Sequence, residues 1–85
     1  MKLIKDQQFK AKWGIWVYQG LTNNNWECER CGRNRKHCHE FLGYTNPDEA
    51  KTNPGGFNYH TLYGTECVKE FLKGLDKNEN HKRLR

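Results

Sequence analysis

Residues 28–32 read CERCG and residues 63–67 read YGTEC. Two residues between Cys28 and Cys31 let a tight turn point both sulfur atoms at one metal ion, with a glycine after it. Cys67 follows a threonine that can cap a helix, so we expect it in the first helical turn. The helix dipole favours a thiolate there. The two segments together predict a metal site between a turn and the start of a helix.

The compartment decides whether four cysteines form disulfides or bind a metal. Residues 1–6 (MKLIKD) lack the apolar stretch and cleavage site of a secretory signal, and no apolar run reaches membrane-spanning length. We therefore expect a cytoplasmic protein, in the host cytoplasm if a phage encodes it, with reduced thiols and no membrane contact. Reduced cysteines clustered with histidines predict one bound Zn²⁺.

The chain has 85 residues, of which 34% are hydrophobic, 29% charged and 13% aromatic. One domain of this size buries too little apolar surface to be comfortably stable without support. We expect a single zinc-binding domain over residues 1–75 and a flexible charged tail over residues 76–85, where apolar residues stop recurring.

Strands and turns alternate before the expected helix. Residues 12–19 are rich in β-branched and aromatic side chains and predict a strand covered on both faces. Its alternation places one set of side chains on one face and a second set on the other, namely Trp13, Ile15 and Val17 against Trp16 and Tyr18. Residues 20–25 predict a turn that completes a hairpin leading into the first cysteine pair.

A second hairpin is expected from residues 36–44 and their partner, residues 57–63. Residues 45–56 (TNPDEAKTNPGG) contain two Asn-Pro steps and a Gly-Gly pair, which predict a long exposed loop. The fold class is therefore α+β, with antiparallel hairpins followed by one C-terminal helix.

The helix is expected to begin at Thr65. Apolar residues recur at i, i+3, i+4 and i+7 and predict one buried stripe of Val68, Phe71, Leu72 and Leu75. Gly74 suits the residue that ends a helix in left-handed conformation.

Cys38 is the favoured fourth ligand, because an all-thiolate site uses every cysteine. Strand alternation points Cys38 away from His37 and His39, so either histidine is an alternative to it. His60, Glu70 or a water molecule stay open as further alternatives.

The segments CERCG and YGTEC resemble the pattern of small zinc-binding proteins, often phage or bacterial, with a treble-clef-like fold. The resemblance covers residues 26–73. It implies the hairpin-and-helix fold and the metal, and it implies no particular activity.

Four protein ligands would leave the zinc structural, and function would then lie on the surface. Arg30, Arg33, Arg35 and Lys36 form a basic cluster beside the first cysteine pair, and the formal net charge is +5. Together with aromatic residues such as Trp13, Trp16 and Tyr59, these features predict a non-enzymatic module that acts through a basic and aromatic surface on nucleic acid or a nucleic-acid-associated protein. We expect no small-molecule substrate, and the sequence does not predict an oligomeric state.

Two alternatives stay open. One is a phage inhibitor that docks on a host protein. The other is an HNH-like metal-dependent nuclease, which a weaker likeness at His37 or His39, Gly55-Gly56, Asn58 and Cys67 suggests. Glu70 stands where that pattern expects a cysteine, and no histidine follows in the expected helix to complete a catalytic metal site.

Overall fold

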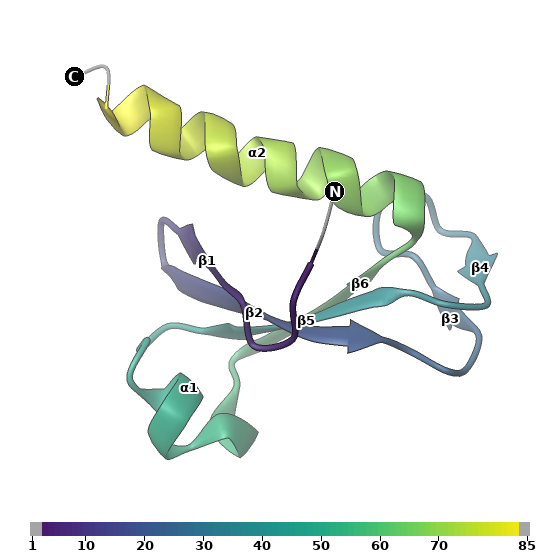
Figure 1. Cartoon of the computed structure of the whole chain (residues 1–85), viewed down its shortest axis with the longest axis horizontal. Helices are drawn as coiled ribbons and strands as arrows, with labels where there is room; N and C mark the ends of the chain where they lie inside the picture. Colours follow the sequence, from purple (N-terminus) through teal and green to yellow (C-terminus); the bar gives the residue numbers. More distant parts are fainter. Residues whose placement is uncertain (1–2, 84–85) are drawn as a thin grey trace.

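The computed structural model describes the backbone of residues 3–83 and the side chains of residues 3–75. It is an α+β fold of mostly antiparallel strands and one long helix. A four-stranded sheet has the order β1-β2-β5-β6, and a separate two-stranded sheet pairs β3 with β4. Helix α2 crosses one face of the large sheet and α1 lies on the other side (Figure 1). The elements are β1 Gln8–Ala11, β2 Gly14–Leu21, β3 Trp26–Glu27, β4 Asn34–Arg35, β5 His39–Tyr44, α1 Glu49–Thr52, η1 Pro54–Gly56, β6 Tyr59–Tyr63 and α2 Thr65–Arg83.

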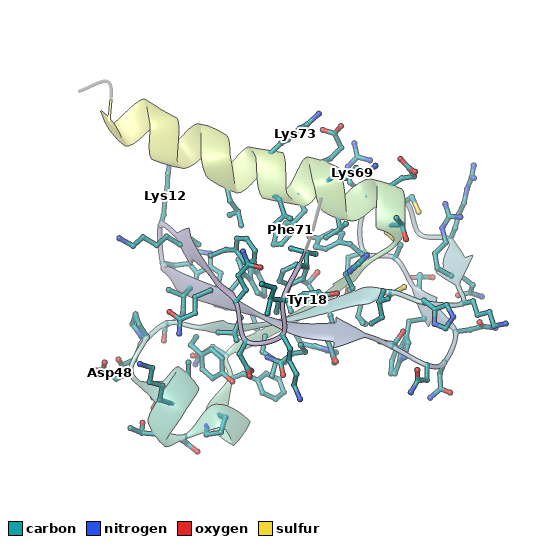
Figure 2. The ribbon with its side chains drawn as sticks, in the orientation of Figure 1. Lys12, Tyr18, Asp48, Lys69, Phe71 and Lys73 are labelled. Carbon is teal, nitrogen blue, oxygen red and sulfur yellow. The ribbon has the colours of Figure 1, made fainter. Side chains whose placement is uncertain are left out.

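Strand β2 lies between β1 and β5 and contributes to the core on both faces, as its sequence predicts. Ile15 and Val17 form one buried cluster with Tyr44. On the opposite face, Tyr18 packs with side chains of β5 and α2, and both Tyr18 and Phe71 lie between the sheet and the helix (Figure 2). Burial of alternate residues against two different layers explains why apolar residues occupy both parities of this strand.

The prediction for Trp13 is wrong. This residue precedes β2, in the turn after β1, where strand alternation no longer applies. Its ring packs edge-to-face on Trp16 at a centroid distance of 5.0 Å, so it lies with Trp16 and not with Ile15.

Strands β5 and β6 pair as predicted, with Phe41 opposite Thr61. The predicted first hairpin is wrong, because β2 pairs with β1 and β5, while β3 pairs with β4. Strand β1 is absent from the sequence prediction because its alternating pattern is weak. Of the residues predicted as a turn, Gly20 still belongs to β2, where it has a left-handed φ of 108° next to a register shift between β2 and β5.

Residues 45–56 are mostly exposed and lie outside the sheet, as predicted, and they hold two short helical turns, α1 and η1, that the sequence prediction did not include. The side-chain oxygen of Asn46 accepts a hydrogen bond from the N–H of Asp48 just before α1. The hydroxyl of buried Tyr44 donates to the carbonyl of Pro54 at 2.7 Å. These local bonds order the segment although its Asn-Pro steps exclude it from the sheet.

Helix α2 begins at Thr65, as predicted, and the Gly64 carbonyl accepts the N–H of Val68 at 2.9 Å. The predicted stripe is confirmed, since Val68 and Leu72 are buried in the core and Phe71 and Leu75 pack against it. The predicted end at Gly74 is wrong, because α2 continues to Arg83.

The side chains of residues 76–85 lie outside the described part of the chain, and the flexibility expected there stays a prediction. Within the described range, no helix combines the length and the apolar character needed to cross a membrane.

Candidate metal centre

Three of the four cysteines meet where α2 begins. The Sγ atoms of Cys28, Cys31 and Cys67 all lie within 4.8 Å of one another. Sulfur atoms, drawn in yellow, lie at this end of the helix in Figure 2. Thiolates bound about 2.3 Å from one tetrahedral ion are separated by roughly 3.8 Å, so small side-chain movements bring these three sulfurs onto a common ion. The donor set therefore fits a metal.

The turn that holds Cys28 and Cys31 joins β3 to β4. The N–H of Gly32 donates to the carbonyl of Cys28 at 2.8 Å, and the N–H of Cys28 donates to the carbonyl of Arg33 at 3.0 Å. Gly32 has φ 72°, in the left-handed region that other residues rarely adopt. This is the backbone position that the sequence predicts for the glycine after the second cysteine.

Cys28 is fully buried, and backbone N–H groups surround its sulfur. Burial by itself raises the pKa of the Cys28 thiol, but hydrogen bonds from the N–H groups of Gly64, Cys31 and Arg30 and from the side chain of Cys67 outweigh burial and lower it to about 6. These donors stabilise a thiolate before any metal contributes its charge.

The pKa of Cys67 shifts in the opposite direction from that of Cys28. Its thiol donates to the Cys28 sulfur, which raises the pKa of Cys67, and burial raises it further. The guanidinium of Arg30 acts in the opposite direction, with Nη1 at 3.9 Å from the Cys67 sulfur. A divalent cation between the two sulfurs would replace the shared proton, so metal binding at this site releases a proton.

Cys38 lies outside the three-cysteine group. It is fully buried, and its thiol donates to the carbonyl of Trp26 at 3.5 Å. Burial raises the pKa of Cys38, and the charge of Cys28 raises it further. The role of Cys38 as the fourth ligand stays a prediction.

The histidines considered as alternative ligands have other partners. His37 Nδ1 donates to the carbonyl of Thr22 at 2.8 Å. His60 Nε2 donates to the carboxylate of Glu40 at 2.6 Å.

His39 Nδ1 forms a 2.7 Å hydrogen bond with the Tyr18 hydroxyl. Burial lowers the pKa of His39, so its ring is neutral at pH 7 and we assign the hydroxyl as the donor. Asn58, a residue of the nuclease-like pattern, accepts bonds from the backbone N–H and the hydroxyl of Thr45. His39 thus bonds to Tyr18 of β2, whereas Asn58 bonds to Thr45, which follows β5.

The predicted basic cluster is exposed around the cysteine turn. Its four members are Arg30, Arg33, Arg35 and Lys36. Arg35 lies opposite Trp26 in the β3–β4 pair, and the Trp26 ring is 44% exposed. The Arg35 side chain also packs on Gly64, where a Cβ atom would lie 3.2 Å from its Cγ atom. The basic side chains and an exposed ring therefore lie in the small sheet and its flanking turns, beside the candidate metal site.

Sequence reasoning missed the part played by Gly64. Its N–H bonds the Cys28 sulfur, and its lack of a side chain leaves room for Arg35. The YGTEC segment predicts a role for its cysteine. The role of its glycine depends on contacts with Cys28 and Arg35, which are distant in the sequence.

Comparisons with protein-family models, with curated proteins and with solved structures yielded no match to this chain.

Proposed function

We propose that this chain is a nucleic-acid-binding module whose fold is stabilised by one structural Zn²⁺. The observation that carries the proposal is the convergence of Cys28, Cys31 and Cys67 within 4.8 Å beneath an exposed basic cluster. Soft thiolate donors favour zinc over the harder divalent cations.

The order of elements around the ion supports a treble-clef-like site. A cysteine turn between β3 and β4 comes first, the β5–β6 hairpin follows, and the first turn of α2 supplies Cys67. Cys38 completes the site in this proposal. Its buried thiol would move toward the other three sulfurs and exchange its bond with the Trp26 carbonyl for a bond to the ion. Four protein ligands leave no coordination position for substrate, so the zinc has a structural role.

The surface around the site supports binding to a polyanion. The β3–β4 segment carries four basic residues, Arg30, Arg33, Arg35 and Lys36, against the two acidic residues Glu27 and Glu29. Arginine guanidinium groups bind phosphates in a bidentate manner. The Trp26 ring, exposed and opposite Arg35, adds a surface on which a base or a sugar can pack.

The test is the salt dependence of binding to a labelled oligonucleotide, with the protein in its zinc-loaded form. The double variant Arg33→Gln/Arg35→Gln should weaken binding. It should also reduce the slope of log K against log salt by roughly 0.7 to 0.9 for each phosphate that the protein no longer neutralises.

The matched control is Lys69→Gln/Lys73→Gln, which removes the same charge from two exposed lysines of α2. Equal weakening of binding in the two double variants would indicate attraction by net charge alone. No binding by the unchanged protein would contradict the proposed partner and leave docking on a host protein as the alternative.

A further inference from the structure

An aromatic groove runs along the edge strand β6 on the face of the sheet that carries α2. It has a volume of about 560 Å³ and is lined by the aromatic residues Trp13, Trp16, Tyr59 and Tyr63, together with Glu29, His60 and Thr61. A groove of this size holds small ring systems. Trp13 is 37% exposed and Tyr59 is 49% exposed, so packing of the core does not explain why these rings lie here.

The rings of this groove are held in place before any partner binds. The Trp13 ring packs edge-to-face on Trp16 at 5.0 Å and on Tyr59 at 4.7 Å. It lies over Gly43, where a Cβ atom would come within 2.7 Å of Trp13 Cη2. Trp16 is in turn held by Phe71 of α2, at 5.7 Å. Ordered rings lose little conformational entropy when a flat partner stacks on them.

The groove ends at the basic cluster. Glu29, which lines the groove, is followed in the chain by Arg30, whose guanidinium lies beside Cys67. Tyr63, also in the lining, is followed by Gly64, on which the Arg35 side chain packs. Two guanidinium groups thus lie where the aromatic lining stops.

Charge separates the two parts of this surface. Among the described residues that line the groove there is a carboxylate, Glu29, and no lysine or arginine. A phosphate is therefore disfavoured inside the groove and favoured at its arginine end. The Glu29 carboxylate can accept a hydrogen bond from the exocyclic amino group of a base.

We propose that the aromatic groove binds unpaired bases of a single-stranded nucleic acid while Arg30 and Arg35 bind the adjoining phosphates. This inference rests on the proposed nucleic-acid-binding function and specifies its substrate class. Bases of a duplex stack on one another and expose only their edges, so they cannot enter the groove, whereas unpaired bases stack on aromatic side chains in any sequence.

The test compares labelled single-stranded and duplex oligonucleotides of the same sequence by fluorescence anisotropy, with zinc-loaded protein. Tyr59→Ala should weaken single-strand binding by roughly 5- to 150-fold and leave duplex binding unchanged. Tyr59→Phe keeps the ring and should bind as the unchanged protein does. The matched control is Phe57→Ala, because Phe57 is 44% exposed and lies two positions away outside the lining. Circular dichroism checks that each variant is folded.

The outcomes separate this inference from the proposed function. If Arg33→Gln/Arg35→Gln weakens binding while Tyr59→Ala and Phe57→Ala do not, the groove inference is overturned and nucleic-acid binding stands. Equal affinity of the unchanged protein for single strand and duplex overturns the inference in the same way. If the unchanged protein binds neither oligonucleotide, both proposals fail.

Discussion

The backbone N–H of Glu29 donates a hydrogen bond of 2.8 Å to the carbonyl of Leu62. Glu29 lies inside the cysteine turn, and Leu62 lies in the edge strand β6, which leads directly into α2. The bond therefore joins the small sheet that carries Cys28 and Cys31 to the strand that positions Cys67. A metal ion held by these cysteines would link the same two parts a second time.

The fourth ligand can be tested with cysteine variants. Cys67→Ser should abolish tight zinc binding and unfold the domain, since a buried serine does not supply a usable thiolate. Cys38→Ser and Cys38→Ala should both lower the zinc affinity by at least about tenfold, measured by competition with a chelator. If Cys38→Ala keeps the affinity of the unchanged protein while Cys67→Ser abolishes zinc binding, Cys38 only packs in the core.

Gly74 gives a test of the length of α2. Alanine is favoured over glycine within a helix, and a Cβ atom at this position meets nothing within 4 Å. Gly74→Ala should therefore raise the free energy of unfolding by about 0.5–1 kcal/mol, measured by urea denaturation. A decrease would indicate that Gly74 has a left-handed conformation and that the helix ends there, as its sequence suggests.

Gly43 leaves the space that the Trp13 ring fills. In Gly43→Ala the new Cβ would lie 2.7 Å from Trp13 Cη2 and 3.0 Å from Trp16 Cζ3, so at least one ring must move. Overpacking of this kind should lower the free energy of unfolding by about 1–3 kcal/mol. Gly55→Ala is the control, because nothing lies within 4 Å of its Cβ position. Similar small effects in both variants would mean that the Trp13 ring is not held over the sheet.

His39 should make the stability depend on pH. Burial lowers the pKa of His39 in the folded state, so the unfolded chain binds more protons as the pH falls through the ordinary histidine pKa of about 6.5. The contribution of the neutral ring is present above that pH and is lost below it.

The measurement is urea unfolding of zinc-loaded protein between about pH 7.5 and 5.5. The difference between the unchanged protein and His39→Gln cancels the effect of pH on the thiolates. The unchanged protein should lose more stability on acidification than the variant does, and parallel curves would contradict the assignment of a neutral His39.

Local sequence patterns were sufficient to predict features that depend on residues within a single helix, strand or turn. The spacing of Cys28 and Cys31 and the stripe of α2 predict the cysteine turn and the buried helix face, and both are found. The alternation in β2 predicts a strand covered on two sides, because side-chain direction in a strand follows from its period.

Features that depend on distant contacts were not predictable. The short strand β3 pairs with β4 and not with β2. The cysteine turn connects β3 directly to β4 and brings these two strands together. Gly74 looks like a helix end, yet α2 continues, so the C-terminal part of the helix does not follow local preference. The aromatic groove depends on the Trp13 ring packing over Gly43. Trp13 lies in the turn between β1 and β2, and Gly43 lies in β5, so the sequence pattern does not indicate that they are in contact.

A metal held by the cysteines is proposed here to stabilise the fold. Elemental analysis of the protein, purified without added metal, tests it most directly. We expect about one equivalent of zinc per chain, and we expect the folded circular dichroism spectrum to disappear when a chelator removes the zinc. Less than about half an equivalent of zinc, with a fold that persists in the chelator, would contradict the claim.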